Sequence, residues 1–170
     1  MVVVMTLGYG VPGFVERGFG VFGDVALLRR NYDRYREALF TEVMPFIESN
    51  YKVGADRESR AIAGLSMGGT ESLFVGLSAL DRFAWIGAFS SGGLPEDFDA
   101  SFAPLDAKAN DRLRLLWVAC GTDDRLIDVN RKLHAWLLAK GVQHTMVETP
   151  GGHTWMVWRR NLAQLLPLLF

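Results

Sequence analysis

Ser66 is the residue whose sequence context most directly indicates chemistry. It stands at the centre of Gly64-Leu65-Ser66-Met67-Gly68, which has the form G-x-S-x-G, and a short apolar run precedes this motif. A helix-like stretch, residues 69–75, follows it. Strand, sharp turn, serine and helix make the layout of a nucleophile elbow, in which a strained turn lifts the serine hydroxyl clear of the sheet. The N–H groups that open the helix would face any negative charge that develops beside the serine.

A serine hydroxyl is a weak nucleophile at neutral pH and needs a base, and the chain offers three histidines. His134 falls in an amphipathic pattern, residues 128–138, and is expected on a helix surface. His144 opens an expected strand, at the sheet end opposite to the strand-to-helix turns. His153 follows the end of that strand, in a loop that contains two glycines. Because sites of open α/β sheets collect at the carboxyl ends of strands, His153 is the predicted base.

A carboxylate should orient the imidazole of the base and stabilise its charged form. The apolar run at residues 113–120 predicts a buried parallel strand, which ends at Gly121-Thr122-Asp123-Asp124. This places two acids at the carboxyl end of a strand, and spacing alone does not separate Asp123 from Asp124. The order serine, aspartate, histidine along the chain is the order of α/β-hydrolases.

Four stretches of the chain together resemble the esterase D and feruloyl esterase group of α/β-hydrolases. That group also includes enterochelin-esterase-like proteins, S-formylglutathione hydrolases and mycolyltransferases. The stretches are residues 56–69, Phe89-Ser90-Ser91-Gly92, Cys120-Gly121-Thr122-Asp123-Asp124 and Gly151-Gly152-His153-Thr154-Trp155.

The resemblance implies an α/β-hydrolase fold, which is an α/β structure with a mostly parallel sheet flanked by helices. In this group the acid lies three residues after the glycine that ends its strand, so the resemblance implies that Asp124 is the acid. It also implies that the backbone N–H of Met67 is one donor to the oxyanion. The form G-G-H-T-W favours the feruloyl or enterochelin-esterase-like branch.

The beginning of the chain departs from this group. Residues 1–10 resemble the strand before the helix that leads to the elbow strand, and three earlier strands, with the loop that supplies the second oxyanion donor, have no counterpart. We therefore expect a reduced, N-terminally short version of the fold. Residues 1–10 could pair directly with the strand at 60–63, a second copy of the chain could fill the gap, or the chain could be a fragment with impaired activity. In the first arrangement, a backbone N–H of residues 8–10 could replace the missing donor.

Alternating strand and helix patterns predict a parallel sheet. Strands are expected at residues 60–63, 83–89, 113–120 and 144–148; helices are expected after Ser66, at 128–138 with a cap at Gly141, and at 156–169 with a disturbance at Pro167.

Three further segments are less regular. An apolar stripe between Tyr35 and Tyr51 predicts a helix that Pro45 kinks or restarts. Residues 11–30 are glycine-rich and apolar, which fits an active-site loop with an acyl pocket and plain loop packing equally well. Residues 94–112 are expected to form a loop or short helix that overhangs the site.

Composition bounds the function classes. A length of 170 residues predicts a single domain, residues 1–170, and a net charge of −1 gives no reason to expect nucleic acid or an anionic membrane as a partner. The single cysteine, Cys120, excludes an internal disulfide and is expected in a strand core. No C-x-x-C or H-E-x-x-H pattern occurs, so neither a metal nor a cofactor is expected. No signal peptide is visible, which favours the cytoplasm for the chain as it stands.

The residues and the resemblance together favour a serine carboxylic-ester hydrolase that uses Ser66, His153 and Asp124. Short-chain or aryl, feruloyl-like esters are the expected small-molecule substrates. Two alternatives stay open: an acyltransferase with the same triad, and a non-catalytic fragment that assembles through an open sheet edge. An exposed apolar edge also predicts a homo-oligomer, a dimer or larger.

Overall fold

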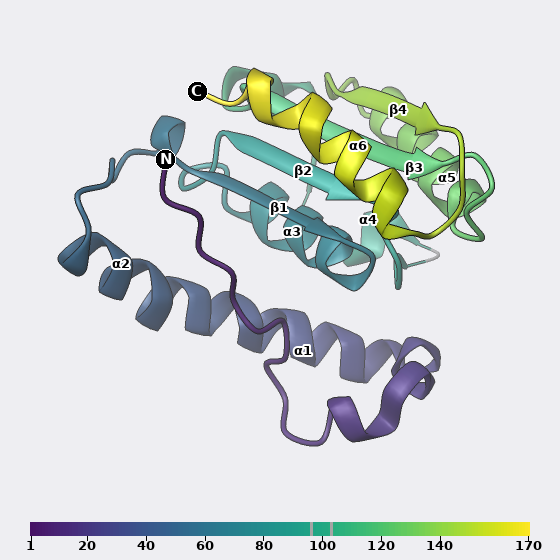
Figure 1. The fold of residues 1–170 in the computed structure, drawn as a ribbon, viewed down its shortest axis with the longest axis horizontal. Coiled ribbons are helices and arrows are strands. Elements are labelled where there is room, and N and C mark those ends of the chain that lie inside the picture. The colour runs from purple at the N-terminus through teal and green to yellow at the C-terminus, as the bar shows by residue number, and fades with distance from the viewer. Residues whose placement is uncertain (96, 103) are drawn as a thin grey trace. The chain divides into compact units, whose positions relative to one another are not determined.

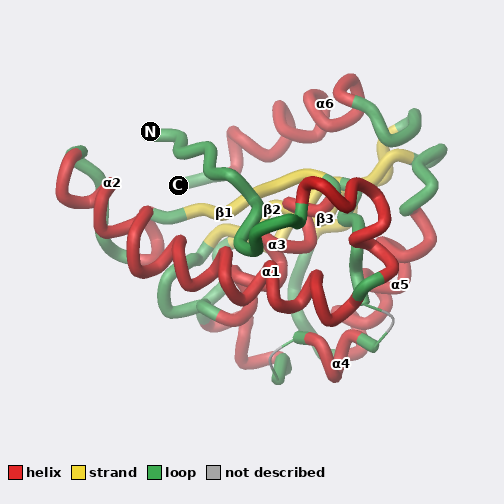
Figure 2. Tube along the Cα trace, turned by 90° about the horizontal axis from the view of Figure 1, so that it is seen from below, coloured by secondary structure: helices red, strands yellow, loops and turns green. Residues whose placement is uncertain are grey.

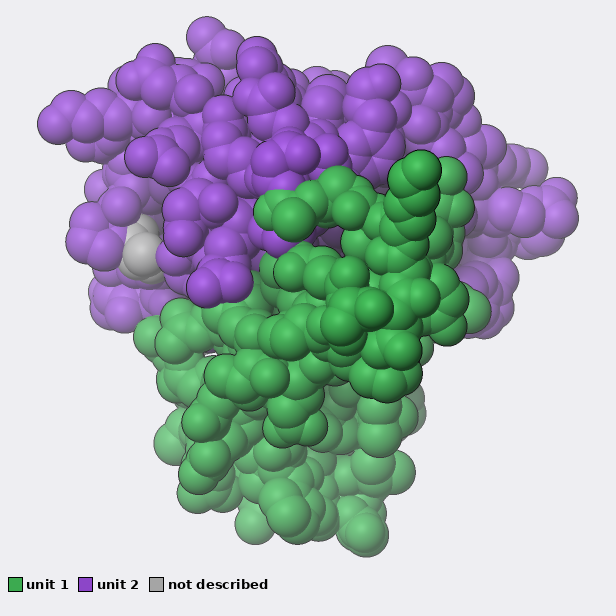
Figure 3. Space-filling model, turned by 90° about the vertical axis from the view of Figure 1, so that its left-hand side faces the viewer, with its two compact units in different colours: residues 1–55 green, residues 56–170 purple. Residues whose placement is uncertain are grey.

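The computed structural model describes residues 1–95, 97–102 and 104–170. They divide into two compact units, residues 1–55 and residues 56–170, which are coloured separately in Figure 3. Each unit has its own set of elements. The single domain expected from the length stays a prediction.

The second unit is built on a four-stranded parallel sheet in the order β1-β2-β3-β4 (Figure 1). Its strands are β1 (Ala61–Leu65), β2 (Trp85–Phe89), β3 (Leu115–Gly121) and β4 (Thr145–Thr149). In the register, Ala63 pairs with Gly87 and Ala88 pairs with Val118. All four expected strands are present, and because they are parallel their carboxyl ends meet at one edge of the sheet.

Helices cover both faces of this sheet. The helices α3 (Met67–Ser78) and α5 (Ile127–Ala139) lie on one face and α6 (Trp155–Leu165) lies on the other, as Figures 1 and 2 show from two directions. Under α6, a buried cluster joins Phe89, Trp117, Ala119 and Leu165. Cys120 is fully buried in β3, which confirms its expected place in a strand core. None of the described helices combines the length and the apolar character needed to cross a bilayer.

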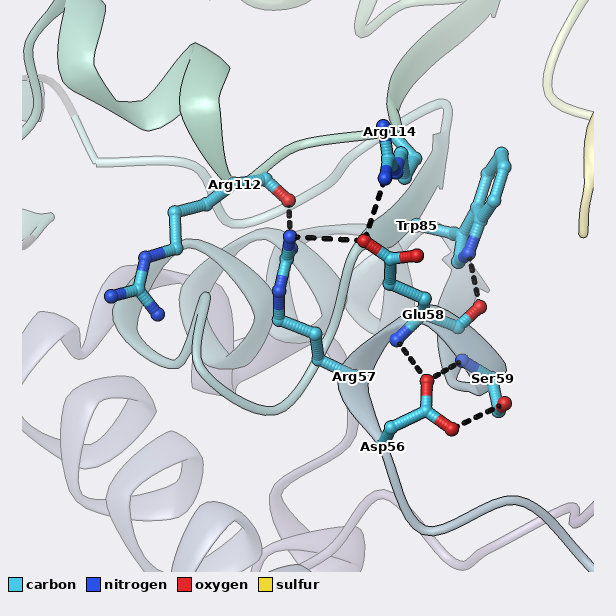
Figure 4. A network of polar contacts seen from close by, with 7 residues as sticks. All are labelled: Asp56, Arg57, Glu58, Ser59, Trp85, Arg112 and Arg114. Atoms are coloured by element: carbon cyan, nitrogen blue, oxygen red, sulfur yellow. Dashed lines mark hydrogen bonds and ion pairs between the residues drawn. The ribbon is translucent and has the colours of Figure 1, made fainter.

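A polar network fixes the amino ends of the strands (Figure 4). Asp56 caps a short 3-10 turn, η3 (Arg57–Ser59), by accepting hydrogen bonds from the backbone N–H groups of Glu58 and Ser59. The Glu58 carboxylate lies 2.7 Å from the Arg114 guanidinium. The Glu58 backbone carbonyl accepts a hydrogen bond from the Trp85 indole. The segments that lead into β1, β2 and β3 are therefore held together before the sheet begins.

The helix ends agree with the sequence signals. Gly141, with a φ of +69°, follows the end of α5, and the neighbouring N–H groups return to carbonyls of the last helical turn. α6 ends at Leu165, and the 3-10 turn η5 (Leu166–Leu168) follows it, because Pro167 cannot continue the backbone hydrogen bonds of the helix.

The first unit is mainly one interrupted helix. The helix α1 (Val25–Ala38) begins at Asp24, whose carboxylate accepts a hydrogen bond from the N–H of Leu27. A π-helical turn, η2 (Leu39–Val43), separates it from α2 (Met44–Asn50). Pro45 lies just after this turn and lacks an N–H to donate, so the local change of helix type confirms the expected interruption.

Two segments correct the sequence analysis. Residues 1–10, expected to be a strand, form no regular secondary structure. Part of their backbone is taken up locally, because the Asn31 side chain accepts from the Gly10 N–H and donates to the Gly8 carbonyl. Residues 11–30, expected as a loop, contain the 3-10 helix η1 (Val15–Gly23) and the start of α1.

β1 is one of the two edge strands of the described sheet. Pairing of residues 1–10 with this edge, and a backbone donor from residues 8–10, stay predictions. Occupation of the β1 edge by a second copy of the chain stays a prediction.

The segment expected as a loop or short helix, residues 94–112, contains Glu96 and Ala103, which lie outside the described residues. Its described part includes two short helices, α4 (Phe98–Ser101) and η4 (Ala107–Asp111). The rings of Phe98 and Phe102 both pack against Trp136 of α5. That it overhangs the site stays a prediction.

Candidate active site

Ser66 occupies the sharp turn between β1 and α3. Its φ of 54° and ψ of −123° are strained for a residue with a side chain, and they persist because the surroundings hold the backbone in place. The Ser66 N–H donates to the Phe89 carbonyl at 2.8 Å, and the Ser66 carbonyl accepts from the N–H of Gly92 at 2.9 Å. The ends of β1 and β2 therefore fix the elbow jointly.

Gly64 makes this turn sterically possible. A β-carbon at Gly64 would lie 2.3 Å from the carbonyl oxygen of Gly68, where α3 crosses back over the strand. Met67 is the first residue of α3, so its N–H has no acceptor within the helix. The hydroxyl of Ser66 and the amino end of the helix thus occupy the same corner of the molecule.

The structure brings Ser66, His153 and Asp124 into one hydrogen-bonded chain. The Nε2 atom of His153 lies 3.1 Å from the Ser66 Oγ, and its Nδ1 atom lies 2.8 Å from the Asp124 Oδ2. The three residues follow the carboxyl ends of β1, β4 and β3, respectively. The imidazole therefore bridges a hydroxyl and a carboxylate, with one ring nitrogen turned to each.

The two candidate acids differ completely in environment. The Asp124 side chain is fully buried and that of Asp123 is exposed. Burial raises the pKa of the Asp124 carboxyl, but hydrogen bonds from the Leu126 N–H, the Ser90 hydroxyl and His153 outweigh burial, so this pKa lies below its ordinary value. Asp124 is therefore held as a buried carboxylate against the imidazole.

The loop that carries His153 is anchored to the end of β3. The N–H of Asp123 donates to the Gly151 carbonyl, and the N–H of Thr122 donates to the Thr149 carbonyl. A β-carbon at Gly121 would lie 2.1 Å from the Gly151 carbonyl oxygen, so the loop can approach β3 this closely only beside a glycine. The backbone of Asp123 thus positions the His153 loop, although its side chain points to solvent.

Trp158 and Ser90 lie beside these hydrogen-bonded residues, and the sequence analysis gave neither of them a role. The Trp158 ring of α6 lies against His153, with ring centroids 4.7 Å apart and an interplanar angle of 89°. Its indole N–H donates to the Ser90 hydroxyl at 3.0 Å. Trp158 follows His153 by five residues, which is the only sequence signal that could have drawn attention to it.

The other two histidines lie away from Ser66 but contact each other. The His134 Nδ1 atom is 2.7 Å from the His144 Nε2, and the His144 Nδ1 is 2.8 Å from the Val142 carbonyl oxygen. This network assigns a neutral His144 that donates from Nδ1 and accepts at Nε2. His144 lies just before β4, as expected, but the pairing of the two rings was not foreseen.

This pair gives a pH dependence to folding. Burial, and secondarily the neighbouring His134, lower the pKa of His144 below its ordinary value of 6.5, against an opposing effect of the Val142 carbonyl. The unfolded chain then binds the proton more readily, so stability is complete above pH 6.5 and falls as the pH drops through that value. We expect wild type to lose more stability than His144→Gln when urea unfolding is compared at about pH 7.5 and about pH 5. Equal losses in the two proteins would contradict this assignment.

Among the described residues, no three His, Cys, Asp or Glu side chains gather so that they could hold a metal ion. Burial raises the pKa of the Cys120 thiol to about 11, so the thiol is neutral at pH 7 and is a poor metal ligand. The groups at the carboxyl edge of the sheet are those of acyl-transfer chemistry: a hydroxyl, an imidazole, a carboxylate and a helix N-terminus.

Parallel strands, flanking helices and a serine on the strand-to-helix turn define the chain as an α/β-hydrolase fold, and solved structures agree. A ferulic acid esterase superposes with a TM-score of 0.66 and 31% sequence identity, over 78% of this chain and 60% of that chain. Residues 27–169 match the Esterase family, which is described as "Putative esterase". The chain belongs to this family.

Two relatives show what this chain is similar to. An endo-1,4-beta-xylanase/feruloyl esterase of Xylanibacter ruminicola is 28% identical over 167 residues, which are 98% of this chain and 21% of the relative. An acetyl esterase of Caldicellulosiruptor saccharolyticus is 26% identical over 95% of this chain and 73% of the relative. The chain thus spans about a fifth of the first relative's length and most of the second's.

Proposed function

We propose that the chain is a serine carboxylic-ester hydrolase, in which Ser66 is the nucleophile, His153 the base and Asp124 the acid that orients it. The observation that carries this proposal is the continuous contact from the Ser66 Oγ through the His153 ring to the buried Asp124. The names of the relatives, feruloyl esterase and acetyl esterase, support short-chain or aryl esters as the substrates.

Each proton transfer in the proposed reaction has a named atom. The His153 Nε2 takes the proton of the Ser66 hydroxyl while the Oγ attacks the ester carbonyl, and Asp124 stabilises the resulting imidazolium. The carbonyl oxygen, now negative, accepts a hydrogen bond from the Met67 N–H. His153 then protonates the leaving alcohol, and an acyl group remains on Ser66. Water, activated by the same nitrogen, attacks this acyl-enzyme and releases the acid.

The Met67 N–H is one oxyanion donor, and loss of a single donor typically raises the barrier by about 3 kcal/mol. The three residues and the Met67 N–H thus supply the groups for acyl-enzyme formation, and the rate depends on what supplies the second oxyanion donor. Transfer of the acyl group to an alcohol in place of water would use the same residues.

Covalent labelling tests the proposal directly. Treatment of the chain with a fluorophosphonate probe, followed by intact mass measurement, should show a single adduct. Digestion should place this adduct on the peptide that contains Ser66. Folded chain that gains no adduct, or gains it elsewhere, would contradict the proposed nucleophile.

A methyl group at Gly121 is expected to separate the base from the acid. It would collide with the Gly151 carbonyl oxygen and push away the loop that carries His153. A displacement of about 1 Å at such a site can lower the rate about a hundredfold. We expect Gly121→Ala to slow fluorophosphonate labelling by about this factor and to lower the unfolding free energy by about 1–3 kcal/mol.

Gly152→Ala is the matched control, because a β-carbon there meets its nearest neighbour, the Asp123 carbonyl oxygen, at 3.5 Å, an ordinary contact distance. The two variants add the same methyl group on the two sides of the contact between the end of β3 and the His153 loop. Similar labelling rates in both would show that the close approach of Gly121 and Gly151 does not hold the site.

A further inference from the structure

Ser90 directly follows β2 and has a conformation that a residue with a side chain seldom adopts. Its φ is 46°, it is fully buried, and its N–H donates to the Ala119 carbonyl at 2.7 Å. Together with Ser66 and the terminal Phe170, it is one of the non-glycine residues with a positive φ among the described residues. Such strain persists where the surroundings over-determine it, often at functional sites.

The Ser90 hydroxyl has a partner on each side. The Trp158 indole nitrogen can only donate, so the Ser90 oxygen accepts this hydrogen bond. The hydroxyl proton is then available to another acceptor. The Ser90 hydroxyl helps to lower the pKa of the Asp124 carboxyl, which points to that carboxylate as the acceptor. Trp158 thereby sets which way the Ser90 hydroxyl points.

The same Trp158 ring lies edge-on to the His153 imidazole. One side chain of α6 therefore contacts the proposed base directly and the proposed acid through Ser90. The buried surroundings strengthen these contacts, because hydrogen bonds to a charged group in a low dielectric are stronger than those in water.

We propose that Ser90 and Trp158 are positioning residues that together hold the Asp124 carboxylate and the His153 ring in line with Ser66. This inference rests on the proposed function of the triad and extends it to β2 and α6. Ser90 fixes the rotation of the carboxylate that faces His153 Nδ1, and Trp158 limits the movement of the ring.

Ser91 provides a matched control for Ser90. Both are fully buried serines in the same turn, but the Ser91 Oγ has no hydrogen-bond partner among the described residues. Ser90→Ala and Ser91→Ala each remove one buried oxygen and leave the β-carbon in place. Only the first removes a donor to Asp124 and leaves the Trp158 N–H without its acceptor.

The test measures kcat and KM for hydrolysis of p-nitrophenyl acetate by these two variants and wild type. Loss of one hydrogen bond to a charged group corresponds to about a tenfold lower kcat for Ser90→Ala. KM should stay near the wild-type value, because Ser90 is fully buried. Ser91→Ala should retain wild-type kcat. Equal kcat in the two variants, or a loss confined to KM, would overturn the proposal.

A double variant with Asp124→Asn shows whether Ser90 affects kcat through the Asp124 carboxylate or only through packing. In an Asp124→Asn background, the further loss caused by Ser90→Ala should nearly vanish, because the carboxylate through which Ser90 acts is already gone. Full additivity of the two losses would contradict the proposal.

Trp158→Phe, which keeps a ring beside His153 but removes the N–H, should lower kcat with little change in the unfolding midpoint. A wild-type kcat in this variant would likewise contradict the role of the indole N–H.

Fluorophosphonate labelling of the wild type distinguishes a failure of this inference from a failure of the proposed function. Wild type that is not labelled on Ser66 would remove the proposed function and this inference with it. Wild type that is labelled and active, with Ser90→Ala indistinguishable from Ser91→Ala, would remove only the role of Ser90 and Trp158.

Discussion

Replacement of Ser66 by alanine should lower kcat for ester hydrolysis by roughly four to six orders of magnitude. The variant loses the only atom that the proposed reaction joins to the acyl group, while His153 and Asp124 keep their 2.8 Å contact. Alanine has the same β-carbon as serine, so it brings no additional strain to a backbone with a φ of 54°. The unfolding midpoint should therefore stay close to that of wild type. The measurement is the initial rate with p-nitrophenyl acetate, alongside thermal unfolding.

Ser78→Ala is the control for this substitution. Ser78 ends α3, and its hydroxyl donates to the Val75 carbonyl of the same helix at 3.0 Å, so its removal should leave the rate unchanged. Ser66→Ala that retains more than about a tenth of the wild-type rate would assign the hydrolysis to another group, since removal of a true nucleophile costs far more.

The position of the site could be predicted from the sequence because local patterns and one topological rule were enough. The turn around Ser66 has its own signature, the strand before Asp124 is an apolar run, and His153 lies in a glycine-containing loop after an expected strand. In a parallel sheet all carboxyl ends meet at one edge, so residues 29 and 87 positions apart come within hydrogen-bond distance.

The contacts that side chains make away from this edge of the sheet could not be predicted from the sequence. Ser90 was visible as the residue after an expected strand, but nothing local shows that its hydroxyl acts on Asp124 or that Trp158 reaches it from α6. The pairing of His134 with His144 likewise depends on how α5 packs against the start of β4. These contacts are set by tertiary packing and side-chain direction, which periodicity does not encode.

The strand expected at residues 1–10 failed for a different physical reason. An apolar β-branched run such as Val2-Val3-Val4 favours extended backbone, but it becomes a strand only when a neighbour pairs with its N–H and C=O groups. In the described structure, two backbone groups of this segment bind Asn31 instead. A segment that resembles a strand of other proteins therefore does not become one without a partner.

The choice between two adjacent aspartates is the sharpest test of the site. Asp124→Asn should lower kcat by about four orders of magnitude, because an amide in place of the carboxylate favours the wrong imidazole tautomer and no longer stabilises the imidazolium. Asparagine has nearly the same size, and the fully buried position is retained. The loss should therefore appear in kcat before it appears in folding at neutral pH.

The same substitution should alter stability in acid. Because the folded pKa of Asp124 lies below the unfolded value of 3.8, the carboxylate stabilises the fold above that value, and this contribution is lost as the pH falls through the folded pKa. Asp124→Asn should accordingly lose less stability than wild type on acidification below about pH 4.

Asp123→Asn supplies the comparison, since its exposed side chain can change while its backbone N–H still holds the Gly151 carbonyl. We expect its kcat to remain within about twofold of wild type, as is usual for an exposed side chain away from the reacting atoms. The two variants differ by one position in the chain and carry the same chemical change. Comparable losses of kcat in both would remove Asp124 from its proposed role, whereas a large loss in Asp124→Asn alone would assign the orienting carboxylate to the buried residue.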